Sequence, residues 1–245
     1  MESEIFIHVA VAGARGKMGR VAVEAFGASK EFDYVGGFAR EADPAERIYS
    51  SVDELLVERI PNVLIDFTTH PASVEVAMKA VTYGVRPVIG ASGWTDDERD
   101  ALARMAGERG IGAMIVPNFS PGAVLMMRYA EEAARYFPSA EIVEMHGAQK
   151  KDKPSGTALQ TATRMQRAGG VKPAIHSVRL PGLVAHQEVL FGGPGEILTI
   201  RHDSFSRESF VPGMFAAVRA VMHVRGLVIG LDTILDEMRK RLSST

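Results

Sequence analysis

Two segments of the chain contain residue types and spacings that could do chemistry. The first is the glycine-rich turn Gly13-Ala14-Arg15-Gly16-Lys17-Met18-Gly19, which follows an apolar run and precedes a run with helical spacing. Glycines permit a tight turn and let backbone N–H groups approach a pyrophosphate, while the helix N-terminus supplies partial positive charge. The spacing is GxxGxxG in place of the commoner GxGxxG, so a glycine-rich turn without a ligand is the alternative. The position between a strand and a helix favours a dinucleotide-binding site.

An acidic residue is expected about 20 residues after such a turn, where it binds the ribose hydroxyls. Counted from Gly19, that position holds Ala39, which is followed by Arg40. A missing carboxylate removes the repulsion against a 2′-phosphate, and a guanidinium can bind that phosphate through two charge-assisted hydrogen bonds. We therefore expect NADPH as the preferred cofactor, with NADH possible. Arg40 as a solvated surface residue is the alternative.

The second segment is Glu144 to Ala158, which reads EMHGAQKKDKPSGTA. His146 ends an apolar run, three lysines follow in a polar loop, and Pro154-Ser155-Gly156-Thr157 opens a predicted helix. Ser155 can cap that helix, and the other N–H groups of its first turn form an anion site to which the lysines add charge. A histidine beside lysines and a helix N-terminus suits protonation of a small anionic substrate. A core histidine and a solvated lysine face are the alternatives.

The composition excludes several classes of protein. The chain has 245 residues, with 28 Lys and Arg against 30 Asp and Glu, so no overall basic field attracts nucleic acid or an anionic membrane. The absence of cysteine excludes disulfides, cysteine zinc sites, iron–sulfur clusters and thiol catalysis. The 7 histidines show no HExxH or comparable spacing, so no metal is expected. With 1 Trp and 5 Tyr, base-stacking platforms for nucleic acid are not expected either.

The sequence also bears on location. The N-terminus, Met1-Glu2-Ser3-Glu4, is acidic where a signal peptide needs positive charge. The uncharged window 110–127 invites a membrane interpretation, but two prolines, an asparagine and a serine in its middle would break a helix in lipid. We interpret this window as a buried strand, a loop and the start of a helix. A cytoplasmic enzyme without membrane or nucleic-acid partners is expected.

The elements that must position these segments change in character along the chain. In the first half, strands are expected at 5–12, 34–38, 63–67, 86–90 and 112–116, and helices at 21–28, 71–83 and 96–109. Alternation of apolar strands with helices predicts a parallel sheet covered on both faces.

After about Ser120 the expected elements are a helix at 122–137, a strand at 140–145, a helix after Pro154, strands at 175–180, 184–191 and 197–202, and a mostly helical tail at 214–238. Turn signals join the last three strands, namely Pro181-Gly182 and Gly192-Gly193-Pro194-Gly195. The fold class is therefore expected to be α/β: a Rossmann-type parallel-sheet domain plus a smaller α+β domain with a mainly antiparallel or mixed sheet.

Five stretches together resemble the dihydrodipicolinate reductase (4-hydroxy-tetrahydrodipicolinate reductase) family of bacterial lysine and diaminopimelate biosynthesis. They are VAGARGKMGR at 11–20, VLIDFT at 63–68, GASGW at 90–94, PNFS at 117–120 and KKDKPSGTA at 150–158, which carries the signature K-x-D-x-P-S-G-T-A. Each motif alone is short, but together they are specific, and the resemblance runs nearly end to end.

The resemblance implies that hydride from NAD(P)H reduces a cyclic dicarboxylate, with loss of water, to tetrahydrodipicolinate. It implies His146 as the general acid and Lys150 as a second proton donor or charge stabiliser that also binds substrate. The substrate's carboxylate would be bound at the helix N-terminus by Ser155, Gly156 and Thr157, and Arg207 would lie near the substrate, with a surface role for Arg207 as the alternative. A proton donor beside cations suits the anion that hydride addition creates.

The same resemblance extends the cofactor site and suggests an assembly. The cofactor residues would be Gly13, Ala14, Arg15, Gly16, Lys17, Met18, Arg40, Gly90, Ala91, Ser92, Pro117, Asn118 and Phe119. Residues 1–120 with 208–245 would form the dinucleotide-binding domain, and 121–207 the domain for substrate binding and oligomerisation. The implied assembly is a homotetramer built through the sheet of the second domain.

Three departures from the family pattern concern substrate affinity more than reaction type. Gly147 follows His146 where the family has a second histidine that touches substrate. Ala91 stands where threonine is usual, and the stretch 166–175 is short. A related cyclic-imine reductase with an altered substrate, or a cofactor-binding protein with weakened catalysis, are therefore the alternative functions.

Overall fold

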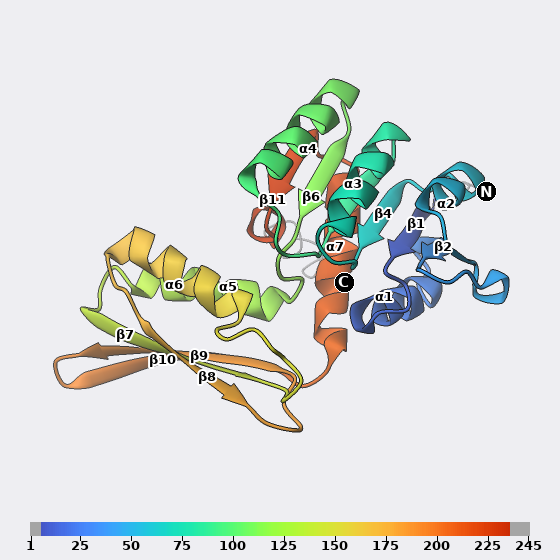
Figure 1. Cartoon of the computed structure of the whole chain (residues 1–245). Coiled ribbons are helices and arrows are strands. Elements are labelled where there is room, and N and C mark those ends of the chain that lie inside the picture. The colour runs from blue at the N-terminus through green and yellow to red at the C-terminus, as the bar shows by residue number, and fades with distance from the viewer. Residues whose placement is uncertain (1–5, 236–245) are drawn as a thin grey trace. The chain divides into compact units, whose positions relative to one another are not determined.

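The computed structural model describes residues 6–235 of the chain. These residues divide into two compact units, which Figure 1 colours along the chain. The larger unit comprises the described residues up to Phe119 together with those from Val211 onward, and the smaller unit is Ser120–Phe210. The chain therefore leaves the larger unit once and returns to complete it.

The larger unit is built on a parallel sheet with the strand order β11-β6-β5-β4-β1-β2-β3. Its strands are β1 Ile7–Ala12, β2 Phe32–Phe38, β3 Ile48–Tyr49, β4 Val63–Asp66, β5 Arg86–Ile89, β6 Gly112–Ile115 and β11 Gly226–Ile229. The chain builds outward from β1 through β2 to β3, and then from β4 in the opposite direction. The neighbours β1 and β4 thus mark the switch point at which open α/β sheets bind ligands, outside the carboxyl ends of their strands.

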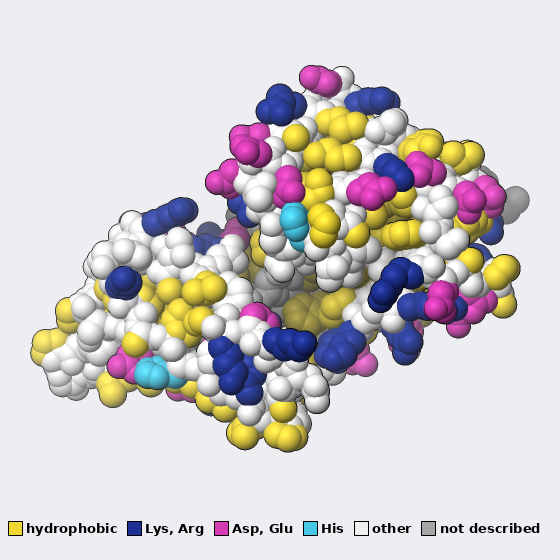
Figure 2. All heavy atoms as spheres, viewed as in Figure 1, with side chains coloured by type: hydrophobic (Ala, Val, Ile, Leu, Met, Phe, Trp, Pro, Cys, Tyr) yellow, Lys and Arg dark blue, Asp and Glu magenta, His cyan; other side chains and the backbone are white. Residues whose placement is uncertain are grey.

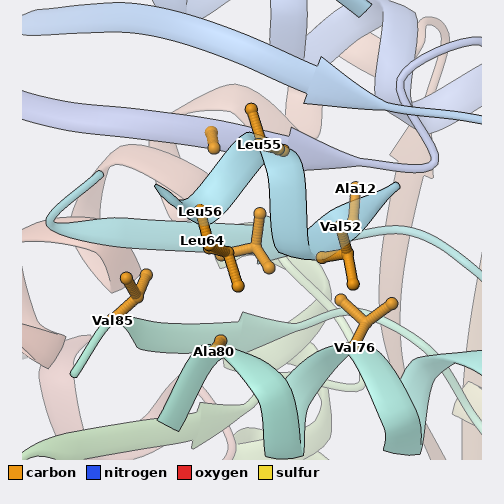
Figure 3. Packing of buried hydrophobic residues seen from close by; sticks show 9 residues of the cluster. Ala12, Val52, Leu55, Leu56, Leu64, Val76, Ala80 and Val85 are labelled. Atoms are coloured by element: carbon orange, nitrogen blue, oxygen red, sulfur yellow. The ribbon is translucent and has the colours of Figure 1, made fainter. Parts of the chain in front are cut away.

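Helices cover both faces of this sheet because its strands are apolar on both sides. The helices are α1 Lys17–Gly27, α2 Val52–Arg59, α3 Ala72–Thr82, α4 Asp96–Arg109 and α7 Val211–Val221, and short 3₁₀ turns lie at Pro44–Glu46 and Asp232–Ile234. On one face, α2 and α3 pack against β1 and β4 through buried side chains that include Leu55, Leu64 and Val76 (Figure 3). On the other face, the rings of Phe26 on α1, Phe32 on β2 and Phe215 on α7 lie about 5 Å apart.

The smaller unit consists of α5 Pro121–Ala133, β7 Ser139–His146, α6 Gly156–Gly169, β8 Ala174–Arg179, β9 Ala185–Gly193, β10 Glu196–Ser204 and a 3₁₀ turn at Arg207–Phe210. Its sheet has the order β10-β9-β7-β8, with β7 and β8 parallel and the other pairs antiparallel. Helices α5 and α6 pack on one face of this sheet around Ile142, Val189 and Phe191. A Cβ built on Gly169 would lie 1.8 Å from the carbonyl oxygen of Ala134. The end of α6 therefore approaches the end of α5 so closely that only glycine fits at this position.

The expected fold class is confirmed, including the interpretation of window 110–127 as strand, loop and helix start. In the described part of the chain, every helix is too short or too polar to cross a lipid bilayer.

Two expectations about the elements were wrong, and one helix was missed. The tail contains the strand β11 after α7 where helix was expected, because a short apolar run such as Gly226–Ile229 has no periodicity of its own and pairs with the edge strand β6. Pro181-Gly182 does not join β8 and β9 into a hairpin. The connection through α6 places β8 parallel to β7, and β9 pairs with the other edge of β7. Helix α2 was not predicted, although Ser51 caps it by accepting from the N–H of Glu54.

Candidate functional site

The glycine turn lies at the switch point of the parallel sheet and is in close contact with the loop after β4. Gly13 has a φ of +72°, and a Cβ built there would lie 2.8 Å from the carbonyl carbon and oxygen of Phe67. A Cβ on Gly19 would lie 2.0 Å from the carbonyl oxygen of Gly13, so only glycine lets α1 begin this close to the turn. The turn is therefore built for close backbone approach.

The N-terminus of α1 is open for an anion. Gly16 is the N-cap with extended backbone, and no side chain caps the first turn of α1. The N–H of Gly16 is used inside the turn, where it donates to the carbonyl of Gly13 over 2.8 Å. An uncapped first turn at a switch point has the donors and the positive dipole end that a pyrophosphate needs, so the residues present fit a dinucleotide cofactor.

The loops after β5 and β6 meet at the same edge of the sheet. Gly90 lies between the rings of Phe67 and Phe119, since its built Cβ would come within 2.9 Å of both, and these rings are 5.5 Å apart. Phe119 is itself buried, and the side chain of Ala91 packs into the core beside Trp94. At Ala91, a cofactor could therefore be contacted only through backbone.

A buried acid that the sequence analysis did not single out connects these loops. Asp66, at the end of β4, accepts from the N–H of Thr68 over 2.7 Å and from the hydroxyl of Ser73. Trp94 donates to that same hydroxyl over 3.2 Å, which joins the loop after β5 to the loop after β4. Burial raises the pKa of Asp66, while the hydrogen bonds from Ser73 and Thr68 act against it.

The cations expected around a 2′-phosphate differ in whether they already form ion pairs with carboxylates. Arg15 is held by Asp43 over 2.8 Å and lies 3.7 Å from Glu41. Arg40 follows β2 and is exposed, with no ion pair to any described residue. Arg40 and Lys17 are thus the more available charges, whereas an incoming phosphate must compete with carboxylates for Arg15.

In the smaller unit, the candidate proton donor His146 stands at the end of β7 on a buried carboxylate. Its Nδ1 lies 2.6 Å from Oε2 of Glu144, two residues earlier on the same face of the strand. Glu144 is fully buried and receives both Nη atoms of Arg179 on β8, over 2.8 and 2.7 Å. The N–H of Ser155 donates to Oε1 of the same carboxylate over 3.2 Å.

These contacts shift the pKa values of Glu144 and His146. Burial alone would raise the pKa of Glu144, but hydrogen bonds from Arg179, Ser177 and His146 outweigh it and lower that pKa to about 2. Because the folded pKa is below the usual 4.5, ionised Glu144 contributes stability above about pH 4.5 that is lost as the pH falls towards 2. Burial lowers the pKa of His146, and Glu144 works against that shift.

The turn expected to bind an anion adjoins the contacts of Glu144. Ser155 is buried and caps α6 by accepting from the N–H of Ala158 over 3.2 Å. A Cβ on Gly156 would have open space around it, so the start of α6 is accessible. Lys150 in the preceding loop lies 2.8 Å from Asp152, and Figure 2 shows Lys and Arg side chains gathered at this end of the unit. Thr157 lies in the first turn of α6.

The sheet register brings Arg207 to the same end of the smaller unit. His146 on β7 pairs with Ala185 on β9, which pairs with Ser204 on β10. Arg207 opens the 3₁₀ turn three residues later, and the hydroxyls of Ser204 and Ser209 are 3.0 Å apart and tie that turn to β10.

The candidate residues thus form two groups. The cofactor candidates gather at the carboxyl ends of the strands of the larger unit, and His146, Lys150, Ser155, Gly156, Thr157 and Arg207 gather at one end of the smaller sheet. The sequence analysis missed Glu144 and Arg179. Strand alternation could have placed Glu144 beside His146, but no sequence signal pairs Arg179 with it. In residues 6–235, no group of three or more His, Asp or Glu side chains is placed to hold a metal ion.

Family models match both units. The N-terminal model of dihydrodipicolinate reductase covers residues 7–119, and the C-terminal model of dihydrodipicolinate reductase covers residues 122–235. The chain belongs to the dihydrodipicolinate reductase family. The expected family, the oxidoreductase class and the use of a nicotinamide dinucleotide are thereby confirmed.

Relatives and solved structures agree with the family. The 4-hydroxy-tetrahydrodipicolinate reductase of Geobacillus kaustophilus is 43% identical over 263 aligned positions, which cover 94% of this chain and 99% of that protein. The dipicolinate-bound dihydrodipicolinate reductase from Paenisporosarcina sp. TG-14 superposes with a TM-score of 0.83 at 36% identity, over 94% of this chain and all of the other. GenD2 from gentamicin A biosynthesis, solved with NAD, has a TM-score of 0.68 at 16% identity over 96% of this chain and 91% of its own, which shows a shared fold.

The role of the close contact between Gly13 and Phe67 in cofactor binding can be tested by comparison with Gly84, a glycine with a similar positive φ. Gly13→Ala and Gly84→Ala both place a side chain at a φ above +70°, but a Cβ at Gly84 meets nothing within 4 Å. Both variants are expected to lose about 1–2 kcal/mol of stability from the backbone strain. Only Gly13→Ala pushes the turn away from Phe67, so only it is expected to raise the Kd for the cofactor at least about tenfold, or roughly 1.4 kcal/mol.

The fluorescence of Trp94, the 1 tryptophan of the chain, and calorimetry measure this Kd, and urea unfolding measures stability. Equal cofactor affinity in the two variants would contradict a role of this contact in binding.

Proposed function

We propose that the protein catalyses the reduction of 4-hydroxy-tetrahydrodipicolinate, with loss of water, to tetrahydrodipicolinate in lysine and diaminopimelate biosynthesis. The observation that carries the proposal is the cluster at the end of β7, where a histidine on a buried carboxylate adjoins a capped helix N-terminus and a lysine. Membership of the family, and relatives that carry this name, support it.

When bound, the reduced nicotinamide supplies a hydride to the conjugated imine of the substrate. His146 then gives a proton from Nε2 to the enamine-like anion, because Nδ1 is occupied by Glu144. Lys150 stabilises the negative charge that develops, or donates a second proton. The backbone N–H groups of Gly156 and Thr157 hold a substrate carboxylate at the start of α6. Ser155 shapes this turn, because its N–H donates to Glu144 and its hydroxyl caps α6. Arg207 faces a substrate charge.

In the larger unit, we assign the cofactor to the glycine turn, with its pyrophosphate on the N-terminus of α1. The uncapped first turn and the glycine contacts support this assignment. The loops at Gly90–Ser92 and Pro117–Phe119 would contact the nicotinamide side, and exposed Arg40 would bind a 2′-phosphate, which makes NADPH the preferred cofactor. We place the reaction in the cytoplasm, the location expected from the sequence.

A homotetramer built through the sheet of the smaller unit is part of the proposal. The face of this sheet opposite α5 and α6 carries Ile197, which is 74% exposed, and Phe205, which is 82% exposed, follows β10 and contacts the ring of His186 on β9. Figure 2 shows hydrophobic side chains at the β9–β10 end of this unit. Burying such side chains against a second copy would remove apolar surface from water.

A second candidate function rests on Gly147. Here the chain lacks the second histidine that the family resemblance implies as a substrate contact, so a related cyclic-imine reductase with an altered substrate is the alternative. A Cβ at Gly147 would lie 3.0 Å from the carbonyl oxygen of Leu183, so a side chain fits if the loop around Leu183 gives by a few tenths of an ångström.

Activity in a coupled assay tests the assigned chemistry. With the aldolase product as substrate and NADPH oxidation as the readout, His146→Ala is expected to lower kcat by about 100- to 10,000-fold, the usual contribution of a general acid. Lys150→Ala is expected to lower kcat as well, and neither variant should change cofactor affinity. His223→Ala removes an exposed histidine of the larger unit and serves as the control. Wild-type kcat in both site variants would remove the proposed roles.

Cofactor preference tests the cations after β2. Arg40→Ala is expected to raise the KM for NADPH by about one to two decades, because one charge-assisted hydrogen bond contributes about 1.5–3 kcal/mol, and to leave the KM for NADH unchanged. Asp43→Asn releases Arg15 and is expected to lower the KM for NADPH. Lys30→Ala, which removes an exposed charge elsewhere on the unit, is the control. A wild-type preference for NADH would refute this part of the proposal.

The missing histidine is tested by adding it. Gly147→His is expected to lower the KM for the dicarboxylate by about tenfold, as one new hydrogen bond to a carboxylate would. Gly147→Ala adds the Cβ alone and controls for the contact with Leu183. If both variants have the same KM, the dicarboxylate does not reach this position and the altered-substrate alternative is favoured.

A further inference from the structure

The carboxylate of Glu144 is saturated with hydrogen-bond donors from three separate segments. Oε2 receives Nη1 of Arg179 and faces Nδ1 of His146, at 2.8 and 2.6 Å. Oε1 receives Nη2 of Arg179 and the N–H of Ser155, at 2.7 and 3.2 Å. Arg179 and Ser155 supply three N–H donors to the two oxygens, and the guanidinium charge keeps the carboxylate ionised, with a pKa lowered to about 2. Glu144 is therefore an acceptor in all four contacts.

This geometry dictates where the proton of His146 resides. A carboxylate that only accepts requires an N–H at Nδ1, both in the neutral and in the protonated imidazole. Nε2 is then the atom that gains and loses the second proton. Arg179 holds the carboxylate in place with a two-pronged contact, so the ring orientation of His146 follows from strand β8 as well as from its own strand.

The ion pair of Glu144 and Arg179 also fixes the position of the loop from Lys150 to Ser155. Nη2 of Arg179 donates to the carbonyl of Asp152 over 2.7 Å, and the side chain of Asp152 holds Nζ of Lys150 at 2.8 Å. At the other end of the loop, Ser155 is bound through its N–H to Glu144. The ion pair therefore holds all three groups in place, namely His146, Lys150 and the capping residue Ser155.

We propose that Glu144, held in place by Arg179, is the positioning residue of this site. It fixes the Nδ1–H tautomer of His146 and holds the loop from Lys150 to Ser155 in place beside that histidine. The proposal deepens the proposed function, since it assigns Nε2 of His146 as the atom that protonates the substrate. Glu144 acts through His146 and the loop and does not touch substrate.

The charges that act on His146 give the proposal a pH signature. They are Glu144 on β7, Arg179 on β8 and Lys150 in the loop. Burial lowers the pKa of His146, Glu144 raises it, and Lys150 and Arg179 lower it. Glu144→Gln should move the pKa of His146 further down, whereas Arg179→Gln should move it up. Opposite shifts would show that both groups are charged beside His146, and the tautomer of His146 then tests whether Glu144 fixes the position of its proton.

The test uses the ring nitrogens of His146 in the ligand-free, ¹⁵N-histidine-labelled protein, with His146→Gln identifying its signals among the 7 histidines. Above the pKa, wild-type His146 is expected as the Nδ1–H tautomer. In Glu144→Gln, an amide facing Nδ1 donates to it, and the tautomer is expected to reverse to Nε2–H. In the coupled assay, kcat of Glu144→Gln is expected to fall about 10- to 100-fold with unchanged cofactor KM, as for other residues that orient a functional histidine.

Glu141→Gln is the matched control, because Glu141 lies on the same strand and binds an exposed histidine, His176, over 2.8 Å. It is expected to leave the tautomer of His146 and kcat unchanged. An Nε2–H tautomer in the wild-type protein overturns the proposal, and this measurement needs no variant to fold. Shifts of the pKa in the same direction for Glu144→Gln and Arg179→Gln also overturn it. The tautomer is read without turnover, so an inactive assay with a wild-type Nδ1–H tautomer contradicts the proposed function alone.

Discussion

A fully buried carboxylate must be surrounded by donors, and in the smaller unit this requirement governs everything around the candidate proton donor. An unpaired charge in the interior costs several kcal/mol, and removing one partner of a buried ion pair typically costs about 3–5 kcal/mol. Glu144 meets the requirement with a guanidinium from β8, a ring nitrogen from its own strand and a backbone N–H from the start of α6. Each donor belongs to a different segment, so satisfying one charge aligns three parts of the chain.

The strand order of the smaller sheet follows the same logic. The crossover through α6 places β8 parallel to β7, in a register that sets Arg179 opposite His146. A β8–β9 hairpin, which the turn at Pro181-Gly182 would suggest, would insert β8 between β7 and β9. Arg207 would still follow β10 at this end of the sheet, but one strand farther from His146. The mixed topology is thus what lets strand ends from distant parts of the sequence share one site.

In the larger unit, the governing constraint is steric instead of electrostatic. The turn after β1, the loop after β4 and the start of α1 approach each other at distances that exclude a Cβ at Gly13 and Gly19. Asp66 then joins the loops after β4 and β5 through Ser73 and Trp94, so the edge of the sheet that carries the candidate cofactor residues is held by polar contacts beneath it. Contact with a pyrophosphate requires such bare backbone, and the fold provides it where the strand order reverses.

The amino-acid sequence by itself determined the parallel-sheet class, the glycine turn, the helix cap at Ser155 and the family, because each depends on local spacing or on motifs that lie within a few residues. Periodicity could not determine the strand Gly226–Ile229, whose identity depends on pairing with β6, or the neighbours of β8, which depend on the crossover. The pairing of Glu144 with Arg179, 35 residues apart, was likewise invisible in the sequence. Only the tertiary structure decided which charges meet in the interior, since the cost of burying a charge depends on partners that the folded sheet alone brings within hydrogen-bond distance.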